Sequence, residues 1–149
     1  MYAERRFPLV ATYGPPLHRI LLPFAFGATA GGLLTDIVYI RSMDMQWSNF
    51  AAWLITAGAI VLVVCVLVGL FDLVTHRLSY SGTLKWPYAA LLVVGLIIAI
   101  FNTMVHTHDA WTSVMPWGIT LSVIGTLVLL AAGLVGWPHL PTREREDRT

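Results

Sequence analysis

The sequence is poor in charge and in cysteine. Lys, Arg, Asp and Glu together make up 11% of its 149 residues, whereas hydrophobic residues make up 57%. No segment outside the apolar stretches is long enough to build the core of a soluble domain. The single cysteine, Cys65, excludes an intrachain disulfide. The formal net charge is only +1 and the basic residues are better explained by lipid headgroups, so nucleic-acid binding is not expected.

The sequence also lacks the short motifs of self-sufficient enzymes. It contains no G-x-S-x-G elbow, no H-E-x-x-H zinc motif, no C-x-x-C pair and no phosphate-binding glycine loop. We therefore expect a non-catalytic protein rather than an enzyme.

Four long apolar stretches are present, at about residues 20–40, 50–74, 87–106 and 114–137. At 1.5 Å per residue, about 20 residues of helix cross a hydrocarbon core of about 30 Å. All six tryptophans lie at or near the ends of these stretches, where indole rings anchor in the membrane interface. The pattern predicts one all-α membrane domain over residues 1–149, a four-helix up-down-up-down bundle with a polar tail at 138–149.

The positive charges are distributed to one side of this bundle. Eight of the nine Lys and Arg residues precede the first stretch, lie between the second and third, or follow the fourth; Arg41 is the exception. Because positive loops favour the cytoplasmic side, both termini are expected to be cytoplasmic. Residues 41–49 and 107–113 are then expected to face outward.

Small and polar residues recur at spacings of three and four along the stretches. In lipid, helices associate through close approach at small residues and through polar contacts, so these faces are expected to look inward. In the first, third and fourth stretches the faces are Ala25, Ala28, Gly32 and Asp36; Gly95, Ala99, Asn102 and His106; and Gly118, Ser122, Gly125, Ala132 and Gly136, interrupted by Leu129. The second stretch is less clearly sided, with Gly58, Val61, Cys65, Gly69, Asp72 and His76 on one line.

Several polar residues would meet near the outer ends of the stretches. A charged side chain within a span costs about 3 kcal/mol, so Asp36 is either a functional group or is bonded to a neighbouring helix or loop. Together with Asn102, His106 and His108 it forms a candidate outer-face metal or transport site. Imidazole and thioether ligands suit copper, although methionine is also an ordinary apolar filler. The nearby methionines are Met43, Met45, Met104 and Met115.

A second candidate site lies at the inner side. His18 and His76 flank the first and second stretches on helices that are expected to be neighbours. A b-type haem needs two axial ligands from different helices at one depth, and this pair offers them. With Asp72 one turn from His76, the three residues form a candidate haem b or quinone site. The alternative is a pair of interfacial histidines beside lipid phosphates.

The segment Gly14 to Gly27, GPPLHRILLPFAFG, resembles the opening signature of the bacterial four-helix membrane family catalogued as domain of unknown function 2231, roughly GHPLHPxLVHFPIG. Thr35-Asp36-Ile37 matches the F-D-L of that family, and the second stretch is similar to its A-G and G-L-I-D-W patterns through Asp72. The resemblance covers residues 14–137. It implies a multi-pass protein of the bacterial inner membrane, without an agreed activity.

The chain departs from this family at several histidines. Pro15, Pro23 and Tyr88 stand where the family usually has histidine, and the closing segment Gly136-Trp137-Pro138-His139 differs as well. If the family histidines bind haem or metal, this chain has lost most of them.

The resemblance also suggests a role, because family members occur beside or fused to redox domains. The leading hypothesis is a small accessory or anchoring subunit of a larger membrane assembly linked to electron transfer, whose partners are the lipid bilayer and other membrane subunits. One alternative is an electron carrier that binds haem b or quinone. Another is a small metal-handling or transport protein that uses the outer-face residues.

Overall fold

The computed structural model describes residues 17–74 and 85–136. Over these ranges the elements are α1 (Leu17–Ser42), α2 (Met45–Val74), α3 (Lys85–Val105), α4 (Ala110–Val114) and α5 (Trp117–Gly136). Four helical segments are long and apolar enough to cross a membrane, with α4 and α5 together contributing to the fourth. The predicted all-α, four-span fold is thus confirmed.

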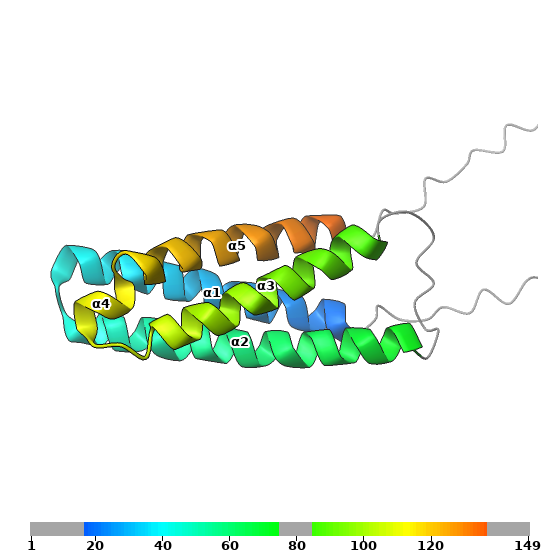
Figure 1. Cartoon of the computed structure of the whole chain (residues 1–149), viewed down its shortest axis with the longest axis horizontal. Coiled ribbons are helices and arrows are strands. Elements are labelled where there is room, and N and C mark those ends of the chain that lie inside the picture. The colour runs from blue at the N-terminus through cyan, green and yellow to red at the C-terminus, as the bar shows by residue number, and fades with distance from the viewer. Residues whose placement is uncertain (1–16, 75–84, 137–149) are drawn as a thin grey trace, which may run out of the picture.

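The long helices lie side by side in an elongated bundle (Figure 1). Successive long helices run in opposite directions, and α4 lies at one end, which we call the α4 end. The interface between α1 and α2 is the most extensive, and α3 packs against α5, α1 against α5 and α2 against α3. Each long helix therefore contacts the helices next to it around a closed ring.

The interior of the ring is built largely from the small-residue faces. All four positions predicted for the third stretch are buried, the last of which directly follows α3, and so is the predicted face of α5. Leu129 interrupts the small residues of α5, but it is also buried. Its side chain packs directly against Gly95 of α3, where an added Cβ would lie only 2.9 Å from Leu129 Cδ2. The leucine occupies the space that the glycine leaves open.

The predicted faces of α1 and α2 are only partly correct. In α1, Thr29 is buried and Ala28 is only half-buried. In α2, Cys65 is buried but Val61 and Gly69 are half-buried. The buried apolar side chains of α2 include Ala51, Ile55, Ala59 and Leu62, none of which belongs to the predicted line of residues.

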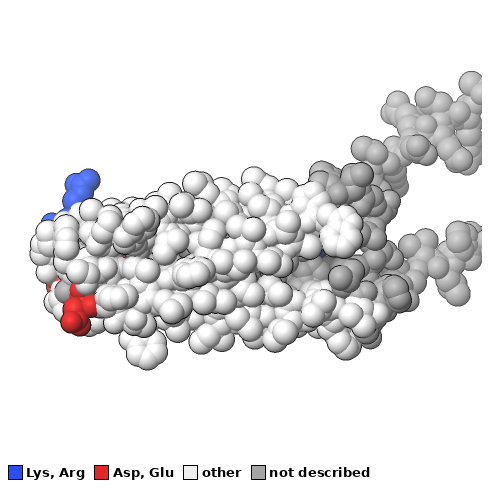
Figure 2. Space-filling model, in the orientation of Figure 1, with Lys and Arg blue, Asp and Glu red and all other residues white. Residues whose placement is uncertain are grey.

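The surface of the bundle is apolar along the helices. On the face shown in Figure 2, charged atoms of the described residues gather at the α4 end, and the remaining described surface is uncharged. Large apolar side chains such as Phe24, Leu67, Ile97 and Leu127 are exposed. In membrane-spanning helices this surface contacts the lipid bilayer.

Both connections at the α4 end are more helical than expected. Only Met43 and Asp44 separate α1 from α2, because Asp44 Oδ1 accepts a hydrogen bond from Gln46 N at 3.0 Å and caps the new helix before its apolar part begins. Within residues 107–113 the chain forms most of α4. Pro116 ends this helix because a residue preceding proline avoids the helical region, and Met115 is extended at φ −111° and ψ 135°.

Candidate functional site

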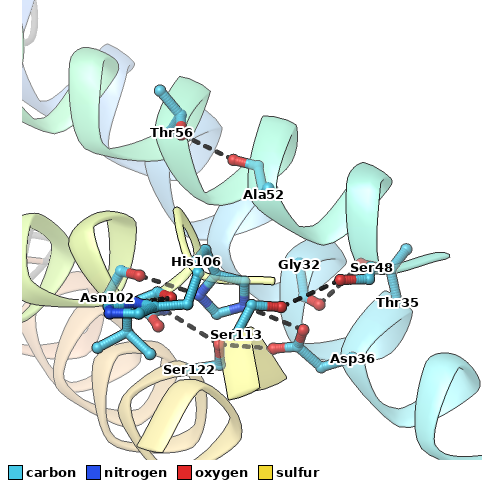
Figure 3. A network of polar contacts seen from close by, with 12 residues as sticks. Gly32, Thr35, Asp36, Ser48, Ala52, Thr56, Asn102, His106, Ser113 and Ser122 are labelled. Atoms are coloured by element: carbon cyan, nitrogen blue, oxygen red, sulfur yellow. Dashed lines mark hydrogen bonds and ion pairs between the residues drawn. The ribbon is translucent and has the colours of Figure 1, made fainter. Parts of the chain in front are cut away.

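The largest group of buried polar side chains in the described part of the chain lies near the α4 end (Figure 3). Asp36 comes from α1, Asn102 from α3, Ser122 from α5, and His106 follows the last turn of α3. None of the four is more than 6% exposed. Three helices that are distant in sequence thus contribute to one polar cluster, which we call the Asp36 network.

Hydrogen bonds connect these side chains into a closed chain. His106 Nε2 lies 3.1 Å from Asp36 Oδ1, and Ser122 Oγ donates to Asp36 Oδ2 at 2.8 Å. Asn102 Nδ2 donates to Ser122 Oγ at 3.0 Å, while His106 Nδ1 lies 2.9 Å from the Asn102 carbonyl oxygen. Both carboxylate oxygens and both imidazole nitrogens therefore have partners. Asn102 Oδ1 is a buried acceptor that has no hydrogen-bond partner among the described residues.

The end of α3 explains how His106 is oriented. Asn102 and His106 are four residues apart, so they lie on one face of a helix. The Asn102 carbonyl accepts both the His106 backbone N–H, at 3.0 Å, and the His106 ring. A carbonyl oxygen has two lone pairs, so the Asn102 carbonyl can accept a hydrogen bond from the imidazole in addition to the one from the backbone.

A glycine at the start of α5 allows the chain to close over His106. A Cβ at Gly118 would collide with the Ser113 carbonyl oxygen and lie 2.9 Å from His106 Cε1. No residue with a side chain fits at this position without displacing α4 or the imidazole.

The α4 end is tied down by two further contacts. Ser48 of α2 and Ser113 of α4 have hydroxyl oxygens 3.1 Å apart and both side chains are buried. The rings of Tyr39 in α1 and Trp111 in α4 have centroids 6.5 Å apart. The short helix α4 is therefore bound to both α1 and α2 beside the Asp36 network (Figure 3).

The structure brings together three of the four residues predicted for the outer-face metal or transport site. Asp36, Asn102 and His106 meet, whereas His108 is exposed and its Nδ1 lies 2.9 Å from the Val105 carbonyl oxygen. Within residues 17–74 and 85–136, no group of three or more His, Cys, Asp or Glu side chains is placed to hold a metal ion. Both nitrogens of His106 are engaged within the protein. The metal site stays a prediction, and the observed contacts are those of a hydrogen-bond network.

Of the predicted haem or quinone site, only His18 is fully described. Its side chain is 1% exposed, its ring centroid lies 5.7 Å from that of Tyr88, and its carbonyl accepts from Cys65 Sγ at 3.1 Å. The backbone of Asp72 belongs to α2, but its side chain is outside the described part of the structure, and so is the whole of His76. The pairing of these three residues stays a prediction.

Sequence reasoning missed three hydroxyl groups at the α4 end. Ser122 was assigned to a packing face, and Ser48 and Ser113 were not singled out. The sequence does indicate that Ser122 and Asp36 lie at a similar depth in the membrane. Ser122 is near the start of its span and Asp36 is near the end of its own, and these two ends lie on the same side of the bundle. Which serine faces which carboxylate depends on the rotation of each helix, and the packing of all four sets that rotation.

Comparison with protein families matches residues 14–139 to the family described as predicted membrane protein (DUF2231). Comparison with curated proteins gave no match, and comparison with solved structures gave none either. The matched range includes the Gly14 to Gly27 segment, Asp36 and every helix of the bundle. The chain therefore belongs to the DUF2231 family of predicted membrane proteins.

Proposed function

We propose that this chain is a small accessory or anchoring subunit of a larger membrane assembly. The observation that carries the proposal is that the Asp36 network is closed. Asp36 is 0% exposed and His106 is 6% exposed, and their polar atoms bond to each other, to Ser122 of α5 and to the Asn102 carbonyl of α3. A catalytic or transport site needs a polar group that can reach a substrate. This cluster instead contributes to holding α1, α3 and α5 together.

The surface of the bundle is suited to contact with other membrane proteins. The described loops are short, with two residues between α1 and α2, so within residues 17–74 and 85–136 little surface apart from the helices is available for binding. The long apolar faces of the helices are the main surface that remains, and helix packing in lipid needs close contact rather than a deep pocket. The link to electron transfer rests on the resemblance to a family whose members occur beside redox domains.

The proposed location is the bacterial inner membrane, with both termini in the cytoplasm. The sided distribution of Lys and Arg supports this orientation, because eight of the nine lie at one end of the bundle's spans in sequence. The α4 end then faces outward, and Arg41 is the single positive residue on that side.

Gentle purification tests the proposal. The chain would be isolated from its native membranes in a mild detergent, in two preparations that carry the tag at opposite termini, so that a tag that blocks an interface is recognised. An unrelated membrane protein with the same tag, prepared in parallel, identifies chains that bind non-specifically. The expected result is a particle larger than the 16.4 kDa chain that contains the same additional subunits in both preparations. Recovery of the free chain alone in both would contradict the proposal.

A haem b or quinone site at His18, His76 and Asp72 is the second candidate. The observation that favours it is the burial of His18 at 1% exposure, since a histidine that merely meets lipid phosphates is expected to be exposed. Reduced-minus-oxidised absorption spectra of the freshly purified protein test the haem part. A Soret change that disappears in His18→Ala supports it, and the lack of any Soret change in the unaltered protein removes it.

A further inference from the structure

We infer that Asp36 and His106 form a buried binding site for one proton, which the two side chains share between Oδ1 and Nε2. The ligand is the proton itself. The site does not depend on the proposed role as a subunit, and no partner protein is needed to form it. Groups that can only donate or only accept fix the direction of the hydrogen bonds in the Asp36 network, and these directions show where a proton is required.

Two groups in the network have a fixed role. A backbone carbonyl oxygen only accepts, so the contact of 2.9 Å between His106 Nδ1 and the Asn102 carbonyl requires a hydrogen on Nδ1. The Asn102 amide nitrogen only donates, so Ser122 Oγ accepts at 3.0 Å and must place its own hydrogen toward Asp36 Oδ2, 2.8 Å away. The direction of every hydrogen bond described within the network is then assigned, except at the contact between Nε2 and Oδ1.

That last contact requires one proton. With none, an ionised carboxylate and the lone pair of Nε2 would face each other at 3.1 Å as two acceptors. With two, an acid O–H and an N–H would face each other as two donors. One proton gives either imidazolium with carboxylate or neutral imidazole with carboxylic acid, and both arrangements have zero net charge. The buried position favours this neutrality, because an isolated ion in an apolar interior costs several kcal/mol (order of magnitude).

The elements around the pair contribute hydroxyl groups rather than charges. α5 contributes Ser122, and α2 and α4 contribute the Ser48–Ser113 pair (Figure 3). Tyr39 lies one turn along α1 from Asp36, and its ring packs against that of Trp111. Tyr39 is buried, whereas the other described charged or titratable groups near this end of the bundle are exposed: Arg41, Asp44, His108 and Asp109. Among the described neighbours, none of these is a hydrogen-bond partner of the pair, so the shared proton has no competing counter-ion in the network.

Nitrogen-15 NMR on the full chain in lipid bilayers tests the inference. The chain contains five histidines, and His106→Gln identifies the His106 signals by their loss. Carbon-13 labelling of aspartate, assigned with Asp36→Asn, reports the Asp36 carboxyl group in the same samples. The expected result at neutral pH is a protonated Nδ1 together with either a doubly protonated ring and an ionised Asp36, or a single ring proton and a protonated Asp36. A neutral ring beside an ionised Asp36, or a charged ring beside a protonated Asp36, would overturn it.

Two variants provide a matched comparison. Asp36→Asn removes the acid, so the His106 ring is expected to be protonated at Nδ1 alone; a doubly protonated ring in this variant would also overturn the inference. Ser122→Ala keeps both partners of the shared proton and should retain one proton between them. If Asp36→Asn does not fold, the measurements on the unaltered chain and on Ser122→Ala decide the question without it.

Discussion

At the scale of single residues, His106 connects the end of α3 to the Asp36 network. Its ring bonds to Asp36 through Nε2 and to the Asn102 carbonyl through Nδ1, and Gly118 lies against its Cε1 side. Any change that moves the imidazole therefore acts on α1, α3 and α5 together. Gly118 fixes the imidazole by direct contact, and Ser122 fixes it through Asp36.

Gly118→Ala is expected to destabilise the protein by about 1–3 kcal/mol, because the added Cβ collides with the Ser113 carbonyl and with His106. The free energy of unfolding, measured in detergent micelles with increasing denaturant, checks this. Gly133→Ala is the matched control on the same helix, since nothing lies within 4 Å of its added Cβ. The control should be neutral or stabilising by up to about 1 kcal/mol, owing to the better helix propensity of alanine. Equal effects of the two substitutions would show that α5 does not close over His106 as described.

Ser122→Ala is expected to lower the free energy of unfolding by about 1–3 kcal/mol. It leaves Asp36 Oδ2 and Asn102 Nδ2 buried without the hydroxyl that now joins them. Thr126→Val, one turn along α5, removes a hydroxyl that bonds only the Ser122 carbonyl of its own helix, so it should cost less than about 0.5 kcal/mol. If Thr126→Val costs as much as Ser122→Ala, the loss does not come from the interhelical network.

Part of the polar cluster was predictable from the sequence, and part was not. Asp36, Asn102 and His106 could be grouped, because each is polar within an apolar stretch and their depths agree. The exposure of His108, only two residues from His106, was not predictable, because α3 ends at Val105 and the direction of the chain beyond a helix depends on the contacts of the following loop. Ser122 was placed on the correct face, but a serine in a small-residue series looks the same whether it packs or bonds.

At the scale of the elements, helix packing depends on glycines placed against large side chains. In the α1–α2 interface, a Cβ on Gly32 would lie 2.6 Å from Ile55 Cγ1 and 3.6 Å from the Ala51 carbonyl oxygen. The sequence indicated the glycine but not the isoleucine, since small residues mark a close approach without showing what fills it. The same holds for Gly95 and Leu129.

Gly32→Ala is expected to weaken the α1–α2 interface by about 1–3 kcal/mol, because Ile55 is buried at 2% exposure and has little room to move. Gly27→Ala lies on the same helix with nothing within 4 Å of the added Cβ, and should leave stability unchanged or slightly improved. Thermal unfolding of both variants in one detergent provides the comparison. A loss of stability in Gly27→Ala equal to that in Gly32→Ala would contradict the observed rotation of α1.

The ends of the elements were the least predictable feature. The sequence predicts a span that begins at residue 114, but the fourth span covers Trp111–Gly136, and Pro116 lies at the break that divides it into α4 and α5. Hydropathy does not reveal such a break, since Val114 and the residues of α5 are equally apolar in character. Pro116 indicates the break, because the residue before a proline avoids the helical conformation.

At the scale of the whole molecule, the proposed orientation places the α4 end outside the cytoplasm. Thr107→Cys, in a chain with Cys65→Ala, is exposed at that end and should react with a membrane-impermeant thiol reagent on intact cells. A cysteine at Thr83, between the second and third spans in sequence, should react only after the membrane is opened. The opposite labelling pattern would reverse the orientation.

The number of spans followed from hydropathy and length alone, and the structure confirms it. The closed state of the Asp36 network did not follow, because a carboxylate near the end of a span in sequence can face water, lipid or protein. Only the packing of four helices and α4 determines that Asp36 is 0% exposed. The function proposed for the chain depends on that difference.

A double-mutant cycle on Asp36 and His106 tests most directly whether this contact holds the bundle together. The free energy of unfolding would be measured in detergent for the unaltered chain, Asp36→Ala, His106→Ala and the double variant. We predict a coupling energy of about 0.6 kcal/mol and at most about 1.7 kcal/mol, the average and the maximum found for interhelical hydrogen bonds in double-mutant cycles on a membrane protein. Effects of the single substitutions that add to within about 0.3 kcal/mol would contradict the account, because they would show that the two side chains do not stabilise each other.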